Sequence, residues 1–191
     1  MAYQSDILTL PPVGTTDISL CRIEATDRGG RREAERRAVG RLLRHVFGDG
    51  VQLCHDEAGA PSVDIYPGHI SISHTPRLAF LAVDPLHPIG IDAELWRDTL
   101  PALAPRFMNQ REMAVYGASP ELLLRAWTTK EAAFKALGIP QLVVSDIILP
   151  DDADAAVMTA AGRTLSLHFI SPVEGHTVTL ARLLPDGSEG K

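Results

Sequence analysis

The chain has few of the residues that build disulfide frameworks or transition-metal centres. Its only cysteines are Cys21 and Cys54, and they show neither C-x-x-C spacing nor another ligand pattern. Neither a disulfide-rich secreted fold nor a zinc site is therefore indicated.

Long apolar runs are also missing. No stretch is long enough to span a bilayer, and the opening residues 1–6 lack the basic start of a signal peptide. We therefore expect a cytoplasmic protein with no membrane partner and no nucleic-acid partner.

Lysine is scarce, so arginine supplies nearly all of the positive charge. The formal net charge is −6, yet basic residues gather in one short segment, which predicts a basic face on an acidic molecule. Arginine's planar fork suits phosphate, although a solvated helix face is an equally good interpretation. The segment contains Arg22, Arg28, Arg31, Arg32, Arg36, Arg37, Arg41 and Arg44.

The length of 191 residues, 45% of them hydrophobic, allows one large domain or two small ones. Pro85-Leu86-His87-Pro88 is the best candidate boundary, because it is rich in proline. We expect an N-terminal subdomain at 1–86 and a C-terminal subdomain at 87–191, with the catalytic motifs in the second.

The periodicity predicts an α+β fold. Turns are expected at 27–30 and 56–61, loops and short helices at 96–120, and a frayed tail at 185–191. The expected helices cover 31–47 and 120–137, and the expected strands cover 7–10, 18–23, 51–55, 69–73, 78–84, 89–95, 142–149, 164–170 and 176–183.

Glu131 and Lys135 are one turn apart on the predicted helix 120–137, so both can act on one target. Taken alone, this spacing is also typical of an ordinary surface ion pair worth roughly 0.2–0.5 kcal/mol.

Asp92 and Glu94 lie on one face of the predicted strand 89–95, opposite its isoleucines. Two adjacent carboxylates disfavour joint ionisation, and a hard cation such as Mg²⁺ would remove that penalty. A solvated edge strand is the alternative interpretation.

Three motifs in order resemble those of the 4′-phosphopantetheinyl transferases, and the resemblance covers about residues 56–149. The motifs are Ser-His-Thr at 73–75, Gly-Ile-Asp-Ala-Glu at 90–94 and Trp-Thr-Thr-Lys-Glu-Ala-Ala-Phe-Lys at 127–135. The resemblance implies two pseudo-twofold-related α/β subdomains of the surfactin-synthetase-activating type, a monomer, and an active site between the subdomains.

The resemblance also implies the reaction: phosphopantetheine moves from coenzyme A to a serine of an apo acyl or peptidyl carrier protein, with Mg²⁺. It implies metal ligands at Asp92, Glu94 and Glu131, with Glu131 alternatively acting as the base. Catalysis is expected from Glu131 and Lys135. Cofactor contacts are expected from Arg44, Ser73, His74, Lys130 and Lys135, although Lys130 could instead pair with a neighbouring acid.

One position departs from the family pattern. Ala60 stands where the family often has a lysine that contributes to cofactor phosphate binding. Either another cation such as Arg44 or Arg77 supplies that charge, or coenzyme A is held more weakly. A non-catalytic coenzyme A or carrier-protein binding module and a Mg²⁺-dependent pyrophosphate hydrolase remain alternative functions.

Overall fold

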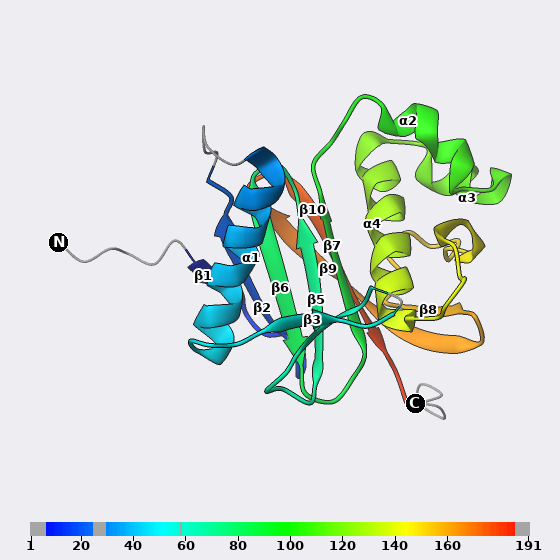
Figure 1. Cartoon of the computed structure of the whole chain (residues 1–191). Coiled ribbons are helices and arrows are strands. Elements are labelled where there is room, and N and C mark those ends of the chain that lie inside the picture. The colour runs from blue at the N-terminus through cyan, green and yellow to red at the C-terminus, as the bar shows by residue number, and fades with distance from the viewer. Residues whose placement is uncertain (1–6, 25–29, 58, 186–191) are drawn as a thin grey trace. The chain divides into compact units, whose positions relative to one another are not determined.

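The computed structural model describes residues 7–24, 30–57 and 59–185 (Figure 1). The chain divides into two compact units, Met1–Leu86 and His87–Lys191. Almost all of the turn expected at 27–30 and of the tail expected at 185–191 lies outside the described residues. None of the helices in the described part is both long and apolar enough to cross a bilayer.

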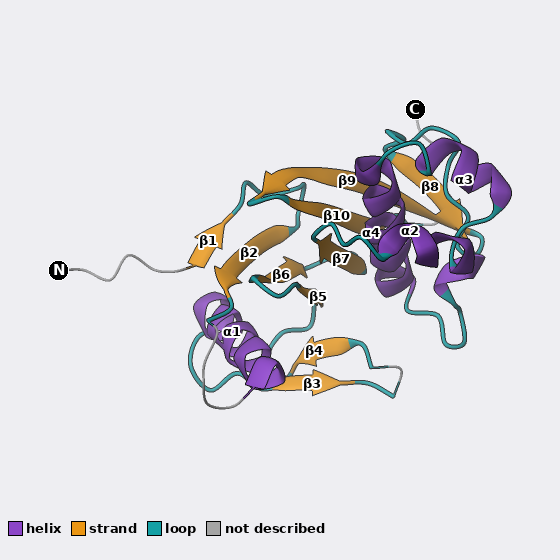
Figure 2. Ribbon diagram, turned by 90° about the horizontal axis from the view of Figure 1, so that it is seen from above, coloured by secondary structure: helices purple, strands orange, loops and turns teal. Residues whose placement is uncertain are grey.

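The first unit contains a four-stranded antiparallel sheet with the order β1-β2-β6-β5. A separate antiparallel ladder joins β3 to β4. Figure 2 shows α1 running beside these strands. The elements are β1 (Ile7–Thr9), β2 (Asp17–Arg22), α1 (Gly30–Phe47), β3 (Leu53–His55), β4 (Pro61–Val63), β5 (His69–His74) and β6 (Leu78–Asp84).

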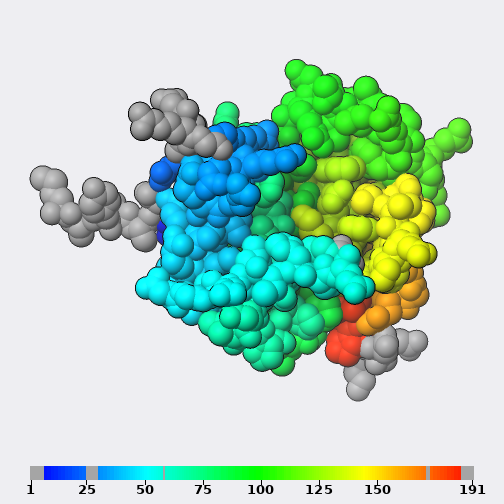
Figure 3. All heavy atoms as spheres, in the orientation of Figure 1, coloured from blue at the N-terminus to red at the C-terminus, as the bar shows by residue number. Residues whose placement is uncertain are grey.

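The core of this unit lies between α1 and the sheet. Ala38, Val39, Leu42 and Leu43 recur at helical spacing and are buried in one cluster with sheet residues such as Leu81. The arginines of α1 are left on its other faces. In Figure 3 this unit presents α1 (blue) and the chain that follows it (cyan) toward the viewer.

The second unit also has a four-stranded antiparallel sheet, with the order β7-β10-β9-β8. Helix α4 packs its alanines and Leu137 against Leu165, Leu167 and Leu183 of this sheet. The elements are β7 (Ile89–Glu94), α2 (Leu100–Leu103), η1 (Ala104–Arg106), α3 (Gln110–Tyr116), α4 (Pro120–Leu137), η2 (Val144–Asp146), β8 (Val157–Ala160), β9 (Arg163–Val173) and β10 (His176–Leu183).

Helix α4 has the predicted bounds, because both of its ends carry strong local signals. The side chain of Ser119 accepts a hydrogen bond from the backbone N–H of Leu122, and Pro120 occupies the first turn. Gly138 ends the helix in the left-handed conformation, at φ 56°.

The strand predicted at 142–149 is wrong. Val143 and Ile148 are exposed, and the segment contains the short 3₁₀ helix η2. Its β-branched residues favoured a strand, but the N–H of Leu149 donates to the side chain of Glu112 and not to a neighbouring strand. The edge strand β8 and the short strand β4 were not predicted. The α+β class is confirmed, and the pseudo-twofold relation stays a prediction.

Candidate active site

Strand β7 carries the two carboxylates predicted to hold a metal. Because side chains alternate across a strand, Gly90, Asp92 and Glu94 share one face. A Cβ atom placed on Gly90 would come within 1.9 Å of the carbonyl oxygen of Ala132 in α4. Glycine therefore allows the backbones of β7 and α4 to approach closely, which brings the acidic face of the strand to the helix.

Lys135 reaches across this contact from α4 to β7. Its Nζ donates to Oδ1 of Asp92 over 2.8 Å and to the carbonyl oxygen of Ile91 over 2.9 Å. The Asp92 side chain is 9% exposed, so the ammonium offsets part of the cost of burying its charge. The structure thus pairs Lys135 with Asp92 on the strand and not with Glu131 on its own helix.

Glu94 is oriented by groups that come from both α4 and the loop after β7. Its Oε1 accepts a hydrogen bond from Nε1 of Trp127 over 3.1 Å and lies 3.6 Å from a guanidinium nitrogen of Arg97. The Trp127 ring packs edge-on against Phe107, with centroids 4.8 Å apart. Trp127 therefore combines packing in the core with a hydrogen bond to the site, and Arg97 is a neighbour that the sequence motifs did not indicate.

The third carboxylate, Glu131, lies within electrostatic reach of the other two. Burial raises the pKa of Glu131, and the negative charge of Asp92 is the next largest cause. Burial also raises the pKa of Glu94, again followed by the charge of Asp92. Arg97 lowers the pKa of Glu94 and Lys135 lowers both pKa values, but these two cations leave the three carboxylates with one uncompensated negative charge.

The chemistry of this donor set suits a hard divalent cation. Carboxylate oxygens are preferred by Mg²⁺, which commonly takes one or two of them and completes its shell with water and substrate phosphates. Across the described residues, no group of three or more His, Cys, Asp and Glu side chains is arranged to hold a metal ion by itself. The site thus has the right ligand type without a closed protein cage.

Lys130 lies away from this site, and its contacts agree with the alternative expectation that it pairs with a neighbouring acid. Its side chain is 0% exposed, and its Nζ lies 2.8 Å from Oε1 of Glu112 and donates to the carbonyl oxygen of Ile147 over 2.5 Å. Lys130 and Glu131 are adjacent on a helix, so their side chains leave it about 100° apart. Lys130 therefore points into the protein interior beside α3, while Lys135 faces β7.

Glu112 is a residue whose role the sequence reasoning missed. Its Oε2 accepts from the N–H of Asn109, which closes a capping box at the start of α3, and its Oε1 accepts from the N–H of Leu149. The spacing Asn109-x-x-Glu112 was a readable signal for the capping box. Nothing in the sequence indicated that Lys130 would complete its partners.

In the first unit, Ser73 and His74 end strand β5. Ser73 is buried and His74 is exposed, because adjacent strand residues point to opposite faces. Nδ1 of His74 lies 3.7 Å from Oε1 of Glu35 on α1, and the same oxygen accepts from Nε of Arg31 over 2.7 Å. His74 is therefore accompanied by a carboxylate and an arginine that the sequence had not linked to it.

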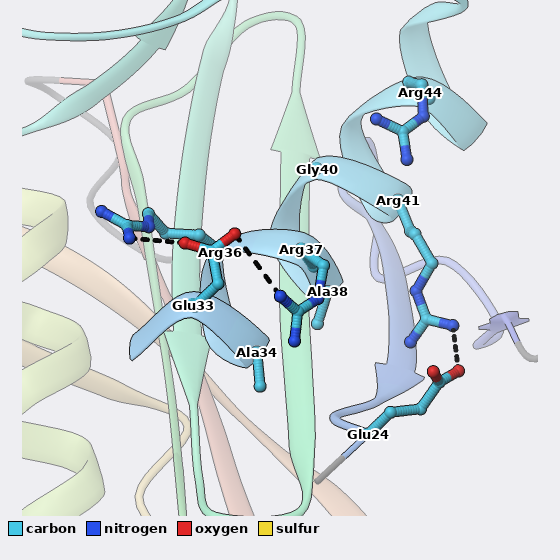
Figure 4. Close-up of a pocket in the computed structure, with 9 residues that line it drawn as sticks. All are labelled: Glu24, Glu33, Ala34, Arg36, Arg37, Ala38, Gly40, Arg41 and Arg44. Atoms are coloured by element: carbon cyan, nitrogen blue, oxygen red, sulfur yellow. Dashed lines mark hydrogen bonds and ion pairs between the residues drawn. The ribbon is translucent and has the colours of Figure 1, made fainter. Parts of the chain in front are cut away.

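Arg44 does not join His74. Nine residues separate Glu35 from Arg44, which places them roughly 180° apart around the helix. Arg44 instead lines a groove of about 460 Å³ on the outward side of α1 (Figure 4). The lining residues are Glu24, Glu33, Ala34, Arg36, Arg37, Ala38, Gly40, Arg41 and Arg44.

Glutamates pair with three of the four guanidinium groups in this groove, although two carboxylates offset only two of the four positive charges. Arg36 lies 2.6 Å and Arg37 3.5 Å from oxygens of Glu33, and Arg41 lies 2.9 Å from Glu24. Arg44 makes no ion pair with any residue that the structure describes. It is consequently the cation of the groove that is best placed to meet an anionic ligand.

The fold and the site together define an α+β protein in which a strand and a helix assemble three carboxylates and one lysine. Residues 88–182, which make up most of the second unit, match the family model of the 4′-phosphopantetheinyl transferase superfamily. Through this unit, the chain belongs to that superfamily.

A curated relative supports the same assignment. The 4′-phosphopantetheinyl transferase HetI from a Nostoc species is 36% identical over 104 residues, which cover 50% of this chain and 44% of the relative. The match between the two chains thus spans less than half of the relative's own length.

Proposed function

We propose that this protein is a transferase that moves 4′-phosphopantetheine from coenzyme A to a serine hydroxyl of an apo acyl or peptidyl carrier protein. The observation that carries the proposal is the assembly of Asp92, Glu94, Glu131 and Lys135 by β7 and α4. In this reaction the serine oxygen bonds to the β-phosphorus of coenzyme A, the diphosphate bond breaks, and adenosine 3′,5′-bisphosphate leaves.

Asp92, Glu94 and Glu131 are the residues that would hold Mg²⁺, whose charge offsets that of the diphosphate when it is bound. Glu131 has a second possible role as the base that takes the serine proton, directly or through water. Its raised pKa supports this role, because a general base works best when its pKa approaches the working pH.

Lys135 is proposed to offset the charge on the phosphates during transfer. Its ammonium lies at the same strand–helix contact as the carboxylates, one turn from Glu131. For the first unit, we propose that Ser73 and His74 contact the nucleotide end of coenzyme A. Arg44 would meet an anionic group from the opposite side of α1. We propose this contact as one source of the positive charge that Ala60 does not supply.

The two-subdomain organisation with a pseudo-twofold axis, the active site between the subdomains, the monomeric state and the cytoplasmic location remain parts of this proposal. The match to the family model covers residues 88–182 alone, so the first unit's role depends on the resemblance of its Ser-His-Thr segment.

The decisive experiment is incubation with coenzyme A, Mg²⁺ and a panel of apo acyl and peptidyl carrier proteins, followed by intact-mass measurement. We expect the mass of at least one carrier to rise by one phosphopantetheine. A carrier whose acceptor serine is replaced by alanine is the control and should show no gain.

The same assay separates the alternatives. A non-catalytic binding module would bind coenzyme A or carrier and leave every carrier mass unchanged. A hydrolase would cleave coenzyme A without any carrier, which chromatography of the nucleotide products would detect. Either result would contradict the proposed transfer.

A further inference from the structure

The ion pair between Lys135 and Asp92 occupies the carboxylate that the proposed function assigns to a metal. Lys135 Nζ is 2.8 Å from Asp92 Oδ1, and the two side chains are 29% and 9% exposed. The following inference rests on the proposed function, because it concerns how the same carboxylate changes partners.

We propose that Lys135 is an internal counter-ion for Asp92, and that a divalent cation and the Lys135 ammonium compete for this carboxylate. In the metal-free protein, the lysine holds the acidic cluster together. When a cation binds, the ammonium gives up Asp92 and becomes available to a phosphate group of the substrate.

Asp92 needs a positive partner even when no metal is bound. A carboxylate that is almost fully removed from water is costly unless an opposite charge or several donors compensate it. Glu94 and Glu131 lie near it and add negative charge, so the need is greater. Lys135 supplies the compensating charge from within the chain.

The contact between Lys135 and Asp92 is built by the fold and is not a chance surface pair. The lysine bonds across two elements, and the backbone carbonyl of Ile91 accepts a second hydrogen bond from the same ammonium. The approach of α4 to β7 at Gly90 sets the reach of Lys135, because a Cβ there would also lie 2.8 Å from the Cβ of Lys135.

The ammonium of Lys135 has a place to remain after it leaves Asp92. The carbonyl oxygen of Ile91 still accepts a bond from Nζ. Lys135 would therefore stay beside the acidic cluster, one turn from Glu131. An ammonium released at this point keeps its hydrogen-bonding capacity and can donate to a phosphate oxygen of the substrate.

The test is a Mn²⁺ titration of the full-length protein without coenzyme A or carrier, read by electron paramagnetic resonance of free Mn²⁺. Lys135→Met and Lys135→Gln both remove the charge but differ in polarity. Arg111→Met is the matched control, since it removes one positive charge from an exposed position of the same unit.

If the ammonium competes, both Lys135 variants should bind Mn²⁺ about tenfold more tightly than the wild type, which corresponds to about 1.4 kcal/mol. The Arg111→Met protein should stay within about twofold, because an exposed charge is screened. Thermal unfolding adds a second readout. In EDTA the Lys135 variants should melt below the wild type, and added Mg²⁺ should raise their midpoint more than it raises that of the wild type.

Unchanged or weaker Mn²⁺ binding by both Lys135 variants, with circular dichroism showing an intact fold, would overturn the counter-ion proposal and leave the transferase proposal standing. If neither the wild type nor the variants bound Mn²⁺, the metal assignment itself would also fail. Transfer to an apo carrier, assayed separately with and without Mg²⁺, would then decide whether the proposed function survives without a metal.

Discussion

Two lysines of α4 each meet a carboxylate, and the surroundings of the two pairs are opposite in kind. Lys130 and Glu112 are both almost fully buried, and the carboxylate also accepts bonds from the N–H groups of Asn109 and Leu149. Lys135 is partly accessible and Asp92 is buried, and two further carboxylates lie near them.

The difference separates a structural pair from a pair that the proposed function uses. The Lys130 pair is balanced in charge and rich in hydrogen bonds, so it has nothing to offer a ligand and fixes α3 and the 147–149 segment to α4. The Lys135 pair lies in a cluster with excess negative charge, which favours a cation or a change of partner. Two lysines of one motif thus have different roles because different elements face them.

The largest effect is expected at Glu131, in the acidic cluster beside the Lys135–Asp92 pair. Glu131→Gln should lower the rate of carrier modification by about 10³-fold, because both metal binding and proton removal depend on the carboxylate. Glu121→Gln, the same change on the exposed first turn of α4, is the matched control and should leave the rate near that of the wild type. Rates come from intact-mass time courses, and a Glu131→Gln rate within tenfold of the wild type would remove Glu131 from the chemistry.

The next largest effect is expected at the Lys130–Glu112 pair. Lys130→Met should lower the free energy of unfolding by about 3 kcal/mol, because Glu112 is left buried without its cation. Adding Glu112→Gln should recover part of the loss, since the uncompensated charge is removed. Urea unfolding followed by circular dichroism measures both values. Lys135→Met should cost clearly less, and equal losses for Lys130→Met and Lys135→Met would contradict the distinction drawn between the pairs.

A smaller effect concerns pH. The pKa values of Glu131 and Glu94 are raised in the folded protein, so folding favours their protonated forms. Their contribution to stability is therefore present below the ordinary glutamate pKa of 4.5 and is lost as the pH rises through the raised values. Thermal midpoints measured without metal across this window should fall less steeply with rising pH in a Glu94→Gln/Glu131→Gln variant. Identical slopes would mean that folding does not raise the pKa values of Glu94 and Glu131.

The smallest effect is expected at the groove of the first unit. Arg44→Ala should raise the KM for coenzyme A about threefold if Arg44 meets an anionic group, with a change in stability below about 0.5 kcal/mol. Arg36→Ala in the same groove is the control, because Arg36 is already paired with Glu33. Steady-state kinetics at low ionic strength give both values, and equal KM values for the two variants would assign Arg44 to the solvated helix face.

Periodic and capped elements could be predicted from the sequence alone. The common face of Asp92 and Glu94 follows from strand alternation, and the ends of α4 follow from Ser119 and Gly138. The segment 142–149 could not be predicted, because its β-branched composition favoured a strand while Glu112 claimed the N–H group of Leu149.

The residues of the candidate site could be named from the sequence motifs, but their contacts with one another could not. The motifs identified Asp92, Glu94, Glu131 and Lys135, but helical spacing does not reveal that Lys135 bonds to Asp92. The partner of Lys130 could not be predicted either, because Glu112 lies 18 positions earlier in the sequence, on another helix. Which element packs against a given helix face is decided by tertiary structure, and no local pattern records it.

The absence of a side chain at Gly90 has a mechanical consequence for this site. One added methyl group would overlap the main chain of the facing helix, so the helix would have to retreat by more than an ordinary thermal displacement. A residue without a side chain therefore sets the span that the lysine must bridge. We expect Gly90→Ala to push α4 away from β7 and so to lengthen the distance that Lys135 must span to reach Asp92.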